Sequence, residues 1–236
     1  MKYKALYQWF AAIFGIWVLR VLYTQSLSNV YLLWNVFLAF LPLLFIDLFP
    51  IVSSRLKRTV KKIAQYGVAL LTILFLPNSF YVLTDFMHLN PSVLVNNHSD
   101  KMYYGVRYMR GDGLYALDSL YIFIAAVISA YMGGMVLAAI YKYAARRLSY
   151  FWSKVVVASV IVLSSVGVVI GRYGRWNSWD AIIMPWRVVA DFWQSMHSVQ
   201  GRNRVFLVAS SMCILQVASL VYILRTTVKV PNTKVE

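Results

Sequence analysis

Six long apolar stretches, separated by short polar segments, constrain the fold of this chain more than any other feature of its sequence. A helix needs about 20 mostly apolar residues to cross the hydrocarbon core of a bilayer, which is roughly 30 Å thick. A soluble protein with six such helices would have too few polar residues left to cover its surface. We therefore predict an all-α bundle of six transmembrane helices, at Ala5–Tyr23, Val30–Val52, Ile63–Leu83, Leu114–Tyr141, Phe151–Ile170 and Val205–Leu224.

The composition and the first stretch support a single integral membrane domain over residues 1–236. Hydrophobic residues make up 61% of the chain and charged residues only 13%, whereas about a quarter of a typical soluble domain is charged. The first stretch contains Arg20 and lacks a clear cleavage site, so we interpret it as an uncleaved span and not as a signal peptide. Arg20 is expected to extend outward from this span toward the outer surface of the membrane.

The formal net charge of +15 would suggest nucleic acid as a partner of a soluble chain. Here most basic residues flank the apolar stretches, which is typical of cytoplasmic loops, and we expect no nucleic-acid partner. With the N-terminus inside, the inner segments carry 14 Lys and Arg residues and the outer segments carry 8, which predicts that both termini are cytoplasmic. Membrane lipids are the expected partners of these cations.

This orientation places the two long connections, Thr84–Gly113 and Gly171–Arg204, on the outer face, together with all three histidines. We therefore expect any polar chemistry there. Within the second connection, Pro185–Ser198 has an apolar face and a polar face at helical spacing, which predicts an amphipathic helix lying on the outer membrane surface. Its apolar face consists of Trp186, Val189, Trp193 and Met196.

A first group of polar residues follows Pro77. If the helix continues past this proline, four polar side chains lie on one stripe that runs toward the outer surface. A carboxylate three residues before a histidine can orient the imidazole or share a proton or a cation with it. The alternative is that the carboxylate caps a loop and the histidine is an ordinary interfacial residue. The stripe consists of Asn78, Tyr81, Asp85 and His88, and Asp85 and His88 are the catalytic candidates.

A second polar group lies at the outer end of the fifth span. Arg172 and Arg175 suit an anionic lipid headgroup or a glycan phosphate, because a guanidinium can donate two parallel hydrogen bonds to such groups. Pairing with Asp85 or Asp118 is the alternative role of these arginines. Asn177 and Asp180 also fit a capping box of the next helix. The candidate ligand-binding residues are Asn78, Tyr81, Asp85, His88, Asp118, Arg172, Arg175, Asn177 and Asp180.

Two prolines lie inside predicted spans. Pro42 and Pro77 each remove one backbone donor, and the freed carbonyl groups need other partners in lipid. The amides of Asn35 and Asn78 are near enough in sequence to serve as such partners.

Small residues spaced by four occur in the fourth and fifth spans. They allow two helices to approach closely, either within one chain or between two copies. The residues are Ala130, Gly134 and Ala138 in one span, and Gly167 and Gly171 in the other.

Familiar catalytic signatures are absent from the sequence. It contains no Gly-x-Ser-x-Gly elbow, no P-loop and no His-Glu-x-x-His motif. The single cysteine, Cys213, permits neither an internal disulfide nor a cysteine cage for a metal. We assign no metal site and no cofactor, and whether the protein is an enzyme stays open.

Three motifs resemble the bacterial membrane family known as domain of unknown function 1361. They are Asn35-x-x-Leu38-Ala39-x-Leu41-Pro42-Leu43, Leu76-Pro77-Asn78-x-x-Tyr81-x-x-Thr84-Asp85-x-x-His88-Leu89 and Gly171-Arg172-x-x-Arg175-Trp176-Asn177-Ser178-Trp179-Asp180. The resemblance covers most of the chain and implies a multi-pass protein of the bacterial cytoplasmic membrane. It implies no activity, substrate or cofactor.

Our leading hypothesis is an outward-facing polar pocket that binds an anionic envelope or lipid-linked ligand, in an accessory or binding subunit. A small transporter or lipid translocase is the first alternative, and it requires a polar path through Asn35 toward Asp47. A membrane-embedded enzyme using Asp85 and His88 is the second. A membrane protein partner or a homodimer also stays open.

Overall fold

The computed structural model describes residues 4–24, 30–55, 58–89 and 113–227, and every regular element among them is helical. This confirms the predicted all-α class. The long helices are α1 (Lys4–Thr24), α2 (Val30–Arg55), α3 (Arg58–Tyr81), α5 (Gly113–Ala145), α6 (Tyr150–Gly174) and α9 (Val199–Thr227). The short ones are the 3₁₀ helix η1 (Val82–Leu89), α7 (Asp180–Ile183) and α8 (Pro185–His197).

Several helices have the length and composition of membrane spans. Within the described residues, 5 helices are long and apolar enough to cross a bilayer, and α1 adds a shorter apolar segment, Gln8–Tyr23. The chain is therefore a multi-pass membrane protein. The five segments overlap the second to sixth predicted spans, and they are Val30–Ile51, Val60–Met87, Ala116–Ala145, Tyr150–Gly174 and Val199–Thr226.

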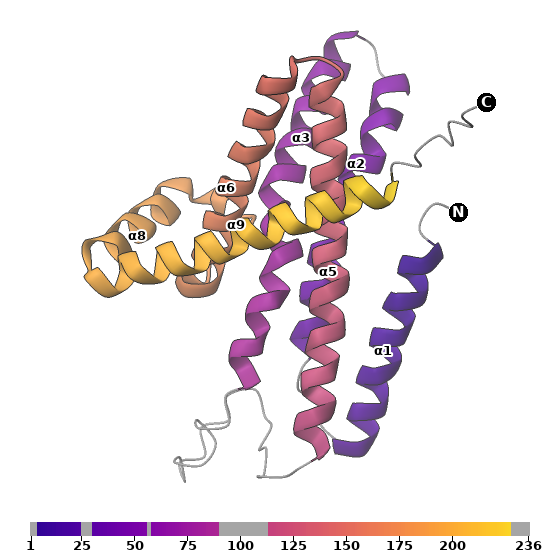
Figure 1. Cartoon of the computed structure of the whole chain (residues 1–236), viewed down its shortest axis with the longest axis vertical. Helices are drawn as coiled ribbons and strands as arrows, with labels where there is room; N and C mark the ends of the chain where they lie inside the picture. Colours follow the sequence, from indigo (N-terminus) through magenta and orange to yellow (C-terminus); the bar gives the residue numbers. More distant parts are fainter. Residues whose placement is uncertain (1–3, 25–29, 56–57, 90–112, 228–236) are drawn as a thin grey trace, which may run out of the picture.

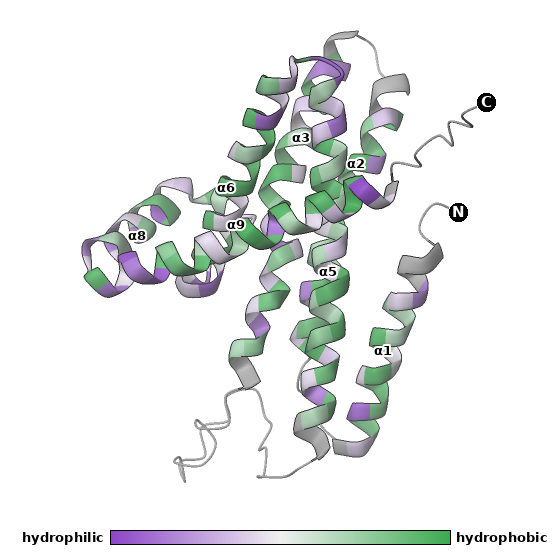
Figure 2. Ribbon diagram, in the orientation of Figure 1, coloured by the Kyte–Doolittle hydropathy of each residue, from purple (hydrophilic) through white to green (hydrophobic). Residues whose placement is uncertain are grey.

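The helix ends and connecting turns lie at two opposite ends of the bundle. Figure 1 shows the turn between α5 and α6 at one end, close to the start of α3, and the starts of α2 and α5 at the other. Apolar residues cover most of the helix surfaces, and hydrophilic residues gather at the α5–α6 turn and on α8 (Figure 2). The helix α9 crosses α5 and α6 obliquely, and with α8 it forms an arm on one side of the bundle (Figure 1).

Small residues let α5 pack in the centre of the bundle. Ala130 and Ala138 are buried. A Cβ at Gly134 would lie 3.0 Å from the carbonyl oxygen of Ser219, so α9 crosses α5 directly over this glycine. On α6, a Cβ at Gly167 would lie 2.7 Å from the ring of Pro77. The small-residue spacing therefore serves packing within one chain.

The predicted prolines lie inside α2 and α3, but the amides expected to satisfy the freed carbonyl groups bond elsewhere. Asn35 donates to the side chain of Asp85, 2.9 Å away. Asn78 donates to the carbonyl of Phe75 at 3.1 Å. Near Pro42, the hydroxyl of Ser79 donates to the carbonyl of Ala39 at 2.9 Å. The short side chain of a serine on α3 thus donates a hydrogen bond to the backbone of α2 near Pro42.

A buried ion pair attaches α1 to α5. The Nε atom of Arg20 donates to Oδ1 of Asp118, and Nη2 donates to Oδ2 at 3.0 Å. Both side chains are fully buried. The expectation that Arg20 extends to the membrane surface is therefore wrong. A carboxylate on the adjacent helix offers the guanidinium a bidentate partner, and this makes burial of the charge tolerable.

Candidate functional site

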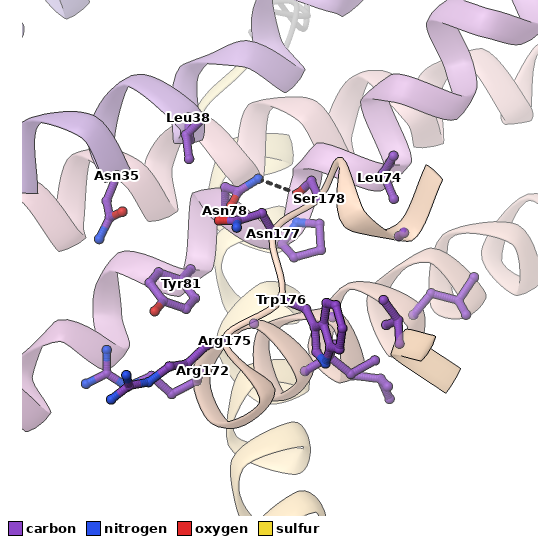
Figure 3. Close-up of a pocket in the computed structure, with 18 of the residues that line it drawn as sticks. Asn35, Leu38, Leu74, Asn78, Tyr81, Arg172, Arg175, Trp176, Asn177 and Ser178 are labelled. Carbon is purple, nitrogen blue, oxygen red and sulfur yellow. Dashed lines mark hydrogen bonds between the residues drawn. The ribbon is translucent and has the colours of Figure 1, made fainter. Parts of the chain in front are cut away.

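A cavity of about 650 Å³ lies between α2, α3 and α6 and is also lined by the segment that connects α6 to α7. Its polar wall combines side chains from all of these parts of the chain, and Figure 3 shows how they surround the space. The polar and aromatic members of this wall are Trp34, Asn35, Asn78, Tyr81, Arg172, Arg175, Trp176, Asn177 and Ser178. The remaining wall is apolar.

The register between α3 and α6 brings the two predicted polar groups together. Pro77 lies against Gly167, and the ring of Tyr81 lies against Gly171, one helical turn further along both helices. Because the two helices run in the same direction past each other, residues after Pro77 meet residues after Gly167. These two distant stretches of chain therefore lie against each other in the structure.

At the wall of the cavity, three polar side chains form a partly buried cluster. Asn35 donates to Oδ2 of Asp85 at 2.9 Å, and Arg172 donates to Oδ1 of the same carboxylate at 3.3 Å. Asp85 is only 1% exposed and the Arg172 side chain 9%. The guanidinium also lies 5.8 Å from the ring centroid of Tyr81, within range of a cation–π contact. Asp85 therefore fixes the position of Arg172 in the cavity wall.

The segment after α6 closes one side of the cavity. Arg175 caps α6 in the left-handed conformation, with φ 56° and ψ 30°, and this turns the chain back over the cavity. Ser178 accepts a hydrogen bond from the amide of Asn78 at 2.9 Å, which ties the segment to α3 (Figure 3). The indole of Trp176 donates to Asp191 of α8 at 2.8 Å. Bonds to two helices therefore hold this segment in place.

Asn177 and Asp180 form a local turn before α7, but they are not a capping box of that helix. The backbone N–H of Asn177 donates to Oδ2 of Asp180 at 2.7 Å, whereas the N-cap of α7 is Trp179 and Asp180 is the first residue of the helix. The amide of Asn177 also approaches this oxygen, at 3.3 Å. Asp180 thus shapes the turn before α7 and does not line the cavity, whereas Asn177 does both.

The nine candidate residues have different positions. Asn78, Tyr81, Arg172, Arg175 and Asn177 line the cavity. Asp85 lies directly behind it, and Asp118 pairs with Arg20 at the interface of α1 and α5. The side chain of His88, like His98 and Asp100 in the connection Thr84–Gly113, lies outside the residues whose side chains the structure describes.

The stripe that begins at Asn78 changes its helical form after Tyr81. We expected an α-helix through His88, but the chain from Val82 onward is a 3₁₀ helix. The hydroxyl of Thr84 donates to the carbonyl of Tyr81 at 2.6 Å where the helix tightens. A 3₁₀ helix has three residues per turn, so the α-helical spacing assumed for Asp85 and His88 does not apply.

Four polar or aromatic residues of the wall were missed as ligand-binding candidates, namely Trp34, Asn35, Trp176 and Ser178. Asn35 was considered only for the backbone or for a path inward, yet it lines the cavity and bonds to Asp85. Ser178 was not singled out, and it joins Asn78 to the closing segment. Asn35 and Ser178 both lie within the motifs quoted above, so the motifs could have pointed to them. The spacing of residues along one helix, however, does not reveal their partners on another helix. In the described part of the chain, no group of three or more His, Cys, Asp or Glu side chains is arranged to hold a metal.

Comparison with known families shows which family the chain belongs to. The model of a family described as "Protein of unknown function (DUF1361)" matches residues 34–219. The chain belongs to this family. In this member of DUF1361, the matched region contains all the residues that line the cavity, from Trp34 to Val188. Helix α1, which carries Arg20, lies outside the matched region. Nothing matches among curated proteins, and nothing matches among solved structures.

Proposed function

We propose that this member of DUF1361 binds an anionic envelope or lipid-linked ligand in the cavity between α2, α3 and α6, as an accessory or binding subunit. The observation that carries the proposal is the convergence of Arg172 and Arg175 on one cavity with several uncharged donors. Ligand sites commonly combine a mostly apolar wall with a few polar groups that orient the ligand. Two guanidinium groups three residues apart, one in the last turn of α6 and one on its C-cap, suit an anion with several acceptor oxygens.

The proposed setting is the bacterial cytoplasmic membrane, with six spans, both termini inside and the cavity facing outward. The excess of Lys and Arg in the short inner segments supports this orientation. Anionic lipid headgroups and phosphate-bearing envelope precursors are ligands that would have access to an outer site.

In the same setting α8 lies on the outer surface of the membrane. Trp186, Val189 and Trp193 are each about two-thirds exposed on α8, and a bilayer interface suits such a face. Trp176, which closes the cavity, bonds to Asp191 on this helix.

A ligand titration tests the proposal. The full chain, purified in an uncharged detergent, is titrated with dioleoyl phosphatidylglycerol while its melting temperature is measured. A ligand that binds the folded state raises this temperature, and we expect Arg175→Gln to remove most of the increase. The matched control is Arg187→Gln, the same change on the exposed surface of α8 outside the cavity wall. An equal increase in the wild type and Arg175→Gln would contradict the proposal.

A further inference from the structure

We infer that the ligand of this cavity is a phosphate-bearing lipid, held with its headgroup at the arginines and one hydrocarbon chain along the apolar wall. This inference rests on the function proposed above and adds the chemical class of the ligand. Soluble compounds also carry phosphate groups, so the arginines alone do not distinguish a lipid from a soluble phosphate. The evidence for a lipid has to come from the apolar part of the cavity.

The cavity has a polar end and an apolar end. On α3 its wall runs from Ile73 and Leu74 to Tyr81, and on α6 it runs from Leu163 to Arg172. Along both helices the cavity wall therefore changes from apolar to polar in the same direction, and the Pro77–Gly167 contact keeps the helices in register. On α2, which runs the other way, the order is reversed, because polar Asn35 comes before apolar Leu38.

The apolar end is too long for a headgroup alone. Leu163 and Arg172 are nine residues apart on one helix, which corresponds to roughly 14 Å along the axis. A phosphate bound at the arginines would leave the space beside Leu163 and Val166 unfilled. An acyl chain fills such a space without leaving any polar group unpaired.

The walls also permit entry from the side. Leu163 is 63% exposed and Trp34 53% exposed, although both line the cavity. They belong to helices that have the length and composition of membrane spans. A wall residue exposed on such a helix faces hydrocarbon, so a lipid chain can enter from the bilayer without passing through water.

The test compares one headgroup with and without chains. Equilibrium binding of radiolabelled dioleoyl phosphatidic acid and of radiolabelled sn-glycerol 3-phosphate is measured on the full chain in detergent. We expect the lipid to bind at least about tenfold more tightly, because its chain makes dispersion contacts along the apolar wall that glycerol 3-phosphate cannot make. Leu163→Trp fills the apolar end and should weaken lipid binding about fivefold or more by overpacking, with no change for glycerol 3-phosphate.

A neighbouring residue provides the control for this substitution. Val162 is 53% exposed on α6 and does not line the cavity, so Val162→Trp should change the binding of neither probe. Equal affinities for both probes, or equal effects of the two tryptophan variants, would overturn the lipid inference. The proposed function would survive that result if Arg175→Gln still weakened the binding of glycerol 3-phosphate. If Arg175→Gln changed the binding of neither probe, the proposed function itself would fail.

Discussion

Arg20 and Asp118 form a fully buried, bidentate ion pair between α1 and α5. The two residues are 98 positions apart in the chain. Since the matched family region begins at residue 34, one partner lies outside it and the other inside. The pair therefore joins α1 to the part of the chain that defines the family.

Removing one member of this pair should destabilise the protein strongly. Arg20→Met leaves the carboxylate of Asp118 without its partner, and such a loss costs about 3–5 kcal/mol. The midpoint of unfolding in detergent measures the effect. Arg225→Met changes an exposed arginine at the end of α9 and should leave the midpoint almost unchanged.

The double variant Arg20→Met/Asp118→Leu separates charge pairing from packing. Replacing both members of a buried pair by apolar residues is often neutral or stabilising, so the double variant should be more stable than Arg20→Met alone. If the double variant were less stable than either single variant, burial of an unpaired charge would not be the cause of the stability loss in Arg20→Met.

The contact of Asp85 with Arg172 should behave as a coupled pair. Asp85→Asn removes the charge that holds the guanidinium, and Arg172→Gln removes the guanidinium itself. Residues in direct contact commonly show interaction free energies of about 0.5–3 kcal/mol in a double-mutant cycle. We therefore expect the double variant to lose less stability than the sum of the two single losses, measured from unfolding midpoints. Strict additivity would contradict a positioning role for Asp85.

Much of the helical framework could be predicted because its signal is local. Each predicted span is an apolar run, and Gly134 and Gly167 carry a spacing that reports close packing. Helical spacing also placed Asn78 and Tyr81 on one face, and both line the cavity. Predicting these features requires only the number of residues per helical turn.

Partners across helices could not be predicted in the same way. Arg20 meets Asp118, and Asn35 meets Asp85, because of how helices pack, and no local pattern specifies which helices are neighbours. The 3₁₀ helix after Tyr81 and the oblique path of α9 were missed for the same reason. Each depends on contacts between segments distant in sequence.

Arg175 has a left-handed backbone conformation that glycine adopts more easily. For a residue with a Cβ this conformation costs about 1–2 kcal/mol. Arg175→Gly should therefore keep or raise the melting temperature and still abolish the temperature increase on addition of phosphatidylglycerol. If Arg175→Gly retained that increase, the guanidinium would have no part in binding. If Arg175→Gly lowered the melting temperature of the ligand-free protein, the side chain would have a structural role as well.

The contact between Gly167 and Pro77 should be sensitive to a single methyl group. The new Cβ of Gly167→Ala would lie 2.7 Å from the proline ring, which cannot rotate away, so α3 and α6 must separate. Overpacking of this kind costs about 1–3 kcal/mol, and the displaced wall should also weaken phosphatidic acid binding. The control is Gly67→Ala on α3, where nothing lies within 4 Å of the new atom. This control should be neutral or slightly stabilising, because alanine favours a helix over glycine by about 1 kcal/mol. Equal unfolding midpoints for the two variants would show that the helices do not meet as closely as the Pro77–Gly167 contact requires.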